Sequence, residues 1–259
     1  MPAARIRVIK GAETISDISD RDRGVLLLHG FFGTPSEMRY LAKALTDAGF
    51  SVFAPRYPGH GTTIEEMSRS SVGAWYACAR EAYIELSSRC REVYVAGLSM
   101  GALFTVLLAE EFSVPKIALM STPTAVTGKG LYLTPVLGRF RKVLYNSKKT
   151  REALNKGVSN PAERARHISY VEGIPLLQVW QLHKMIKRAM KVLPRVESAA
   201  LVVQSRGDDT VPPDSLDRIM RRIGSSKKES LLLERSSHAV TVDYEKDIVA
   251  ERVMSFFLS

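Results

Sequence analysis

Short apolar runs alternate along the chain with longer segments in which apolar residues recur at the helical period of about 3.6 residues. The runs expected to form strands are 25–28, 51–54, 93–96, 117–120, 201–204 and 231–233. The segments expected to form helices are 35–48, 70–89, 100–112, 175–193, 214–223 and 244–257. Continuous apolar runs of this length are typical of parallel strands that are covered on both faces. The alternation therefore predicts an α/β fold, with a mostly parallel sheet and helices on both of its faces.

The alternation is interrupted between residues 121 and 173, where Gly, Pro, Lys and Arg surround scattered Leu, Tyr and Phe. With 259 residues, of which 45% are hydrophobic and 25% charged, the chain is long enough to bury a sizeable core. We therefore expect one core, made of residues 1–120 and 174–259, that carries a small inserted cap at 121–173.

A Gly-x-Ser-x-Gly sequence, residues 97–101, joins the expected strand 93–96 to the expected helix 100–112. Such a pentapeptide is a weak signal alone, but a sharp turn from strand to helix is the setting that a nucleophile elbow requires. Ser99 would then be exposed at the end of the strand, beside the positive end of the helix dipole. The alternative is an ordinary tight turn with a capping serine.

A serine hydroxyl is a poor nucleophile unless a base takes its proton, so a histidine should accompany Ser99. Of the five histidines, only His238 lies in a loop after the last expected strand and before the last expected helix. In a parallel sheet that loop opens on the same edge as the elbow. His238 is therefore the expected base, and an unremarkable surface histidine is the alternative.

The acid that orients the base should follow the expected strand 201–204, and two adjacent carboxylates, Asp208 and Asp209, are found there. The spacing from Pro212 favours Asp208, while Asp209 could hold the loop by an Asx-type hydrogen bond. The order Ser, Asp, His along the chain is that of α/β-hydrolases.

Acyl transfer also needs backbone donors for the developing oxyanion. One should be the N–H of Met100, which follows the nucleophile. The second should come from the loop 29–33 after the first parallel strand, where the N–H of Phe31 is the best candidate. The ring of Phe31 would then form a wall of the acyl pocket, and His29 would order the loop.

Five motifs follow one another along the chain, each at or just after the expected end of a strand. They read Leu-Leu-Leu-His-Gly-Phe-Phe-Gly (26–33), Tyr-Pro-Gly-His-Gly (57–61), Gly-Leu-Ser-Met-Gly (97–101), Arg-Gly-Asp-Asp-Thr-Val-Pro (206–212) and Ser-His (237–238). In combination they resemble the α/β-hydrolase superfamily, and more narrowly the small-cap bacterial carboxylesterases and monoacylglycerol lipases. The resemblance runs from residue 25 to the C-terminus and is interrupted at the insertion.

The resemblance implies an α/β-hydrolase fold and hydrolysis of carboxylic esters without a metal or an organic cofactor. It implies a catalytic triad of Ser99, Asp208 and His238, with Phe31 and Met100 as the oxyanion donors. Four further side chains are candidates for the substrate pocket: Phe32, Leu133, Leu137 and Trp180.

The net charge of +10 belongs to one part of the chain. Residues 121–195 hold fifteen Lys and Arg against three acidic residues, whereas the remainder holds 22 basic and 24 acidic residues. The apolar residues of the cap interleave along the sequence with its Lys and Arg residues. Such a segment can contact an anionic lipid surface transiently, or its apolar face can pack on the core with a solvated basic rim. No nucleic-acid motif accompanies the charge, so no nucleic-acid partner is expected.

The sequence therefore predicts a serine carboxylic-ester hydrolase that acts on short- to medium-chain acyl esters, with monoacylglycerols among the candidates. The alternative is an acyl-CoA thioesterase or acyltransferase that uses the same triad, since a basic cap could meet the CoA phosphates. A non-catalytic binding protein on this scaffold would not need an intact nucleophile, acid, base and oxyanion loop. The two cysteines, Cys78 and Cys90, are too far apart on one helix to bridge, which favours the cytoplasm.

Overall fold

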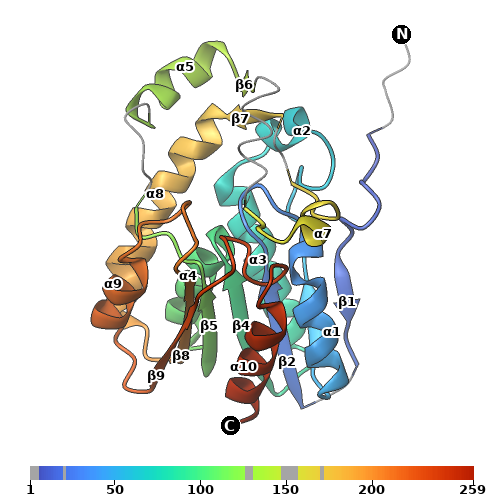
Figure 1. The fold of residues 1–259 in the computed structure, drawn as a ribbon, viewed down its shortest axis with the longest axis vertical. Helices are drawn as coiled ribbons and strands as arrows, with labels where there is room; N and C mark the ends of the chain where they lie inside the picture. The colour runs from blue at the N-terminus through green and yellow to red at the C-terminus, as the bar shows by residue number, and fades with distance from the viewer. Residues whose placement is uncertain (1–5, 20–21, 126–130, 147–156, 170–171) are drawn as a thin grey trace.

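The computed structural model describes residues 6–19, 22–125, 131–146, 157–169 and 172–259 (Figure 1). Within them, a seven-stranded sheet has the order β1-β3-β2-β4-β5-β8-β9. Its strands are β1 (Ile15–Asp17), β2 (Arg23–Leu28), β3 (Ser51–Ala54), β4 (Glu92–Leu98), β5 (Lys116–Met120), β8 (Ala199–Ser205) and β9 (Lys228–Leu233). All neighbours pair in parallel except β1 and β3, which are antiparallel. The prediction of a mostly parallel sheet is confirmed.

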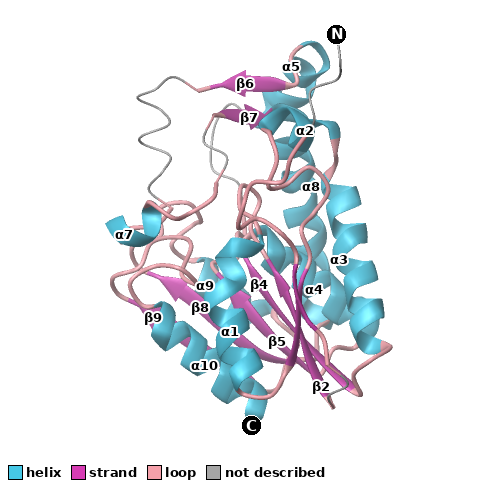
Figure 2. Ribbon diagram, turned by 90° about the vertical axis from the view of Figure 1, so that its right-hand side faces the viewer, coloured by secondary structure: helices cyan, strands magenta, loops and turns pink. Residues whose placement is uncertain are grey.

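Successive residues of the central strands point to opposite faces of the sheet, and both faces are buried. In β2, Leu26 and Leu28 join one apolar cluster, whereas Val25 and Leu27 join the other. The first cluster is covered by α3 (Val72–Ser87), α4 (Met100–Phe112), α8 (Leu176–Val192) and α9 (Ser215–Arg222). The second is covered by α1 (Arg39–Asp47) and α10 (Lys246–Leu258), on the other side of the sheet (Figure 2). The middle of each central strand is apolar because neither face of the sheet meets water there.

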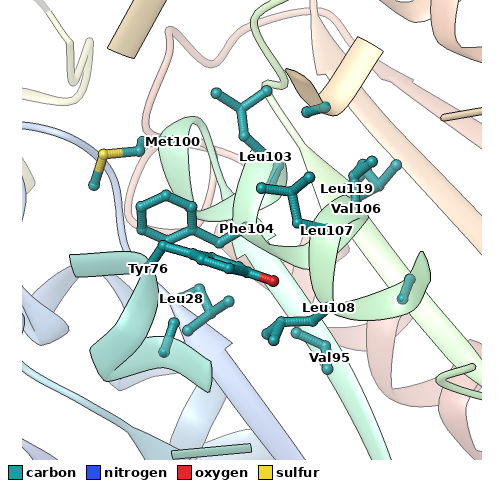
Figure 3. Close-up of a cluster of buried hydrophobic side chains, with 14 of the residues drawn as sticks. Leu28, Tyr76, Val95, Met100, Leu103, Phe104, Val106, Leu107, Leu108 and Leu119 are labelled. Atoms are coloured by element: carbon teal, nitrogen blue, oxygen red, sulfur yellow. The ribbon is translucent and has the colours of Figure 1, made fainter. Parts of the chain in front are cut away.

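Helix α4 is apolar around its whole circumference, because it lies between the sheet and the neighbouring helices. Its residues from Met100 to Ala109 are all buried. Leu103, Phe104 and Leu107 project into the cluster that Figure 3 shows beside Tyr76. Full burial of each such side chain stabilises the fold by about 1.5–3 kcal/mol. The helix that follows Ser99 is thereby fixed firmly against the sheet.

The described part of the expected cap lies beyond the carboxyl ends of the strands (Figure 1). It contains η2 (Leu131–Leu133), α5 (Thr134–Phe140) and β6 (Val143–Tyr145), and β6 pairs antiparallel with β7 (Gly173–Pro175), which crosses the expected boundary at 173. Helix α5 packs on α8, while β6 and β7 contact α2 (Ile64–Arg69). Residues 126–130, 147–156 and 170–171 of the expected cap lie outside the described residues. The boundaries 121–173 remain a prediction.

Residues 157–169, a later part of the expected cap, approach the core; we call them the return segment, and they include α7 (Pro161–Arg164). This segment is attached to the core: Val158 is fully buried in the second apolar cluster. The remaining short elements are η1 (Pro35–Met38) and η3 (Leu193–Arg195). None of the helices in the described ranges combines the length and the apolar character that crossing a bilayer requires.

Candidate active site

Ser99 occupies a sharp turn between β4 and α4, in a backbone conformation that side chains rarely adopt. Its φ is 56° and its ψ is −116°. Two glycines make the turn possible. A Cβ on Gly101 would lie 2.0 Å from the carbonyl oxygen of Leu28, and one on Gly97 would lie 2.3 Å from the backbone of Gly101. Strain of this kind persists only where the surroundings enforce it, and it is concentrated at functional sites.

His238 reaches Ser99 from the loop after β9. Its Nε2 lies 2.9 Å from the Oγ of Ser99, and its Nδ1 lies 2.8 Å from Oδ2 of Asp208. The histidine side chain is 15% exposed, so solvent has limited access to it. Three side chains drawn from a span of 139 residues are therefore aligned in hydrogen-bond contact at the carboxyl ends of β4, β8 and β9.

Asp208, and not its neighbour Asp209, contacts the imidazole. The side chain of Asp208 is fully buried, and Gln204 donates from Nε2 to its Oδ2 at 3.1 Å. The N–H groups of Thr210 and Val211 donate to Oδ1. Burial alone would raise the pKa of this carboxyl, but His238 and the two N–H groups hold that pKa below its ordinary value. The carboxylate is thus ionised and faces Nδ1 as an acceptor, so Nδ1 must carry a proton.

Two residues that sequence reasoning missed hold the loop of His238. Ser121 follows β5 with a φ of 46°, and its hydroxyl donates to the carbonyl oxygen of His238 at 2.7 Å. Asp243 is buried and accepts the N–H of Ser237 at 2.7 Å. Neither residue belongs to a local sequence pattern. The one available signal was that Ser121 directly follows a central strand, at the edge of the sheet where Ser99 and His238 lie.

The loop 29–33 lies directly beside Ser99. A Cβ on Gly30 would be 3.6 Å from the Cβ of Ser99. The carbonyl oxygen of Phe31 accepts from Nε2 of His60 at 2.9 Å, and the Phe31 ring packs against Trp75. Met100 is the first residue of α4, so its N–H is among those that have no partner within the helix. The structure thus places the loop of Phe31 and the first residue of α4 next to Ser99, and the role of Phe31 and Met100 as oxyanion donors stays a prediction.

Two other histidines, His29 and His60, are fully buried beside this loop. Burial lowers the pKa of His29 to about 4 and that of His60 to about 3. Both rings are therefore neutral near pH 7 and serve as hydrogen-bonding and packing groups. The His29 ring lies 4.0 Å from that of Tyr57, and its Nδ1 lies 2.9 Å from the carbonyl oxygen of Gly30. This position agrees with the ordering role expected for His29.

The four candidate pocket residues occupy different surroundings. Phe32 is half-buried and its ring contacts that of Phe31. Leu133 and Leu137 lie on η2 and α5 of the cap and are 60% and 52% exposed. Trp180 lies on α8, where its ring stacks on that of His183. Their role as pocket residues stays a prediction.

Comparison with known proteins shows which family this chain belongs to. Residues 19–245 match the family described as serine aminopeptidase, S33. The chain belongs to this S33 family of α/β-hydrolases. It is 35% identical to a thermostable monoacylglycerol lipase of Bacillus sp. (strain H-257) over 239 residues, which cover 90% of each chain. It is 29% identical to a carboxylesterase of Bacillus subtilis (strain 168) over 236 residues, covering 91% of this chain and 92% of the relative.

Solved structures agree with the S33 assignment. One from a study of two metagenome-derived lipolytic enzymes has a TM-score of 0.88 and 32% identity, and the match covers 96% of this chain and 98% of the other. The monoacylglycerol lipase of Paleococcus ferrophilus shares the fold with a TM-score of 0.75 at 19% identity, over 97% of this chain and 98% of the other. The predicted α/β-hydrolase fold and the family resemblance are confirmed.

Proposed function

We propose that this protein, a serine ester hydrolase, acts on monoacylglycerols and other short- to medium-chain acyl esters through an acyl-enzyme on Ser99. The observation that carries the proposal is the unbroken series of hydrogen bonds from Ser99 through His238 to Asp208. The names of the two curated relatives, a monoacylglycerol lipase and a carboxylesterase, support the choice of substrate class.

In the proposed reaction, Nε2 of His238 takes the proton of Ser99 as Oγ attacks the ester carbonyl carbon. The resulting oxyanion accepts hydrogen bonds from the N–H groups of Phe31 and Met100. When the intermediate collapses, the protonated His238 donates its proton to the leaving alcohol. Water, deprotonated by the same imidazole, then attacks the acyl-enzyme. When this second intermediate collapses, His238 returns the proton to Oγ of Ser99, and the carboxylic acid is released. Asp208 keeps the imidazole in the tautomer that each transfer needs.

Side chains, backbone N–H groups and water are sufficient for each of these steps, as the resemblance implied.

The free thiols of Cys78 and Cys90 support a cytoplasmic location, because pairs of cysteines that remain unbridged are typical of reducing compartments.

The substrate class is tested by steady-state kinetics on monoacylglycerols from butanoyl to hexadecanoyl, with an acyl-CoA of equal chain length beside each. We expect the largest kcat/KM for a monoacylglycerol of short or medium chain, at least about tenfold above the matching thioester, which is a difference of about 1.4 kcal/mol in transition-state binding. An aminoacyl p-nitroanilide is the control for the aminopeptidase activity that the family description names, and it should not be turned over. A larger kcat/KM for the thioester would replace this proposal with the acyl-CoA thioesterase.

The cap carries an exposed surface that is both apolar and basic. We call it the cap face and define it by seven exposed residues on η2, on α5 and in the loop that leads to β6: Leu133, Val136, Leu137, Arg139, Phe140, Arg141 and Lys142. Phe140 is 87% exposed. We propose that this face contacts an anionic lipid surface transiently. Apolar side chains can enter the headgroup region while neighbouring Arg and Lys attract the lipid phosphates.

We expect Phe140→Ser to weaken binding to phosphatidylglycerol vesicles about tenfold or more, because insertion of a phenyl ring contributes about 2 kcal/mol. Sedimentation with vesicles measures the effect. Ile248→Ser is the matched control, because Ile248 is 49% exposed on α10, and α10 lies far from α5 and the cap face (Figure 1). Equal binding to phosphatidylcholine vesicles, or equal losses in the two variants, would contradict the proposed contact.

A further inference from the structure

A buried carboxylate, Glu37, lies beneath the oxyanion loop and has no role in the reaction proposed above. It belongs to η1, and its side chain is 7% exposed. Its Oε2 accepts the N–H of Gly30 at 2.9 Å, and its Oε1 lies 2.9 Å from Nε2 of His167, whose side chain is 9% exposed. Burial alone would raise the pKa of Glu37, but the hydrogen bonds from His167 and Gly30 hold that pKa below its ordinary value. An ionised carboxylate only accepts, so Nε2 of His167 must be the donor.

The loop is closely wrapped around this carboxylate. A Cβ on Gly33 would lie 2.1–2.3 Å from the Glu37 carboxyl atoms, so a larger residue there would displace the carboxyl group. The peptide that joins Gly30 to Phe31 is held through its carbonyl, which contacts Nδ1 of His29 at 2.9 Å and accepts the N–H of Gly33 at 3.3 Å. Because the N–H and C=O of a trans peptide point in opposite directions, this anchoring orients the N–H of Phe31. Glu37 likewise fixes the peptide that joins His29 to Gly30, because it accepts the N–H of Gly30.

The partner of Glu37 comes from the return segment, which also reaches the loop of His238. His167 lies near one end of this segment. At its other end, Asp243 accepts the N–H groups of Ser159 and Asn160, both at 2.8 Å, and the N–H of Ala239 donates to Gly157. The return segment therefore contacts both halves of the candidate catalytic centre before the chain passes on to β7.

We propose that Glu37 and His167 are positioning residues that hold the oxyanion loop in the geometry required by the transition state. The inference rests on the proposed function, because it assumes that the N–H of Phe31 stabilises the oxyanion. Oxyanion donors act only when they are already aimed at the place where charge develops. Loss of the carboxylate would leave the N–H of Gly30 and the ring of His167 buried without a partner, so the loop would shift toward other partners.

The test compares Glu37→Leu with Glu37→Gln on the best ester substrate. The leucine removes both hydrogen bonds, and we expect kcat to fall about 10- to 100-fold while KM changes less than about threefold, because a small misplacement affects mainly the transition state. The glutamine keeps an oxygen for the N–H of Gly30, so we expect its kcat to remain within about fivefold of wild type. Affinity for a trifluoromethyl ketone, whose serine adduct carries the oxyanion, should fall in parallel with kcat/KM.

The matched control is Glu163→Gln, which removes another ion pair of the same return segment, between Glu163 and Lys246 at 2.6 Å. It should leave kcat and ketone affinity unchanged. Active-site titration with a fluorophosphonate corrects each rate for the fraction of folded enzyme. Should Glu37→Leu fail to fold, Glu37→Asp replaces it, since the shorter side chain cannot reach Gly30 and His167 together; its kcat should fall about tenfold.

Unchanged kcat and ketone affinity in the correctly folded variants would overturn the positioning role, as would equal losses in Glu163→Gln. These outcomes are distinguishable from failure of the proposed function. If the proposed function itself were wrong, the ketone would not inhibit the wild-type enzyme, and the fluorophosphonate would not label Ser99.

Discussion

Replacing Ser99 with alanine is expected to lower kcat/KM for monoacylglycerols and p-nitrophenyl esters by about ten-thousandfold or more. The substitution removes the oxygen that His238 faces at 2.9 Å, and with it the acyl-enzyme route. The fold should survive, because alanine and serine are similarly disfavoured at a φ of 56° and the turn is held by Gly97, Gly101 and the buried helix α4. The loss of one hydrogen bond, about 1 kcal/mol, should move the Tm by a few degrees at most.

The matched control is Ser113→Ala at the other end of the same helix. Ser113 also has a positive φ, 53°, although its ψ is 45° and not −116°, and it is exposed, so this variant reports the effect of a serine-to-alanine change at positive φ away from the site. It should retain full activity, and a fluorophosphonate should label it but not Ser99→Ala. Ester turnover that persists in purified Ser99→Ala would remove Ser99 from the role of nucleophile and with it the proposed acyl-enzyme.

The sheet could be predicted because its central strands are apolar on both faces and its helices are long. The runs 25–28, 93–96 and 201–204 all fall within β2, β4 and β8. Strand β1 and the pair β6 and β7 were not predicted. Each has only three residues, and β1 and β6 are largely exposed, so their pairing depends on tertiary contacts and leaves no apolar pattern. Edge strand β9 begins three residues earlier than predicted, at Lys228, because its first residues are polar and exposed.

The candidate triad could be predicted because each member follows a strand at one edge of the sheet. The supporting residues could not. Glu37 and His167 are separated by 130 residues, and their contact depends on how the return segment packs against the oxyanion loop. Asp243 and Ser121 likewise act on His238 through backbone groups, which no side-chain motif records. A motif identifies the reacting groups, whereas the groups that orient them are determined by the packing of distant segments.

Asp208→Asn is expected to lower kcat about a thousandfold or more while the enzyme remains folded at neutral pH. Oδ2 of Asp208 accepts from Nδ1 of His238 at 2.8 Å and from Gln204 at 3.1 Å. An asparagine amide can present its N–H₂ to Nδ1, which then becomes an acceptor. The proton would move to Nε2, and the imidazole could no longer take the proton of Ser99. Initial rates on the best monoacylglycerol, with the tautomer followed by NMR of the ring nitrogens, measure both parts of this effect.

The same variant should change the dependence of stability on pH. The pKa of Asp208 is lower in the folded protein than its ordinary value of 3.8, so the folded state binds fewer protons than the unfolded chain as the pH falls. The stabilisation that ionised Asp208 provides is therefore complete above pH 3.8 and is lost as the pH falls through the folded pKa. Urea unfolding should show the largest difference between wild type and Asp208→Asn near neutral pH, and a shrinking difference below 3.8.

The adjacent exposed residue provides the control for both measurements. Asp209→Asn changes the same charge one residue away, but Asp209 makes no contact with His238 among the hydrogen bonds and ion pairs of the described residues. Its kcat should stay within about threefold of wild type, since exposed charges near a site act only weakly. Equal losses in the two variants would show that the loop needs its total negative charge. A loss confined to Asp209→Asn would transfer the orienting role to Asp209, the alternative that the sequence alone left open.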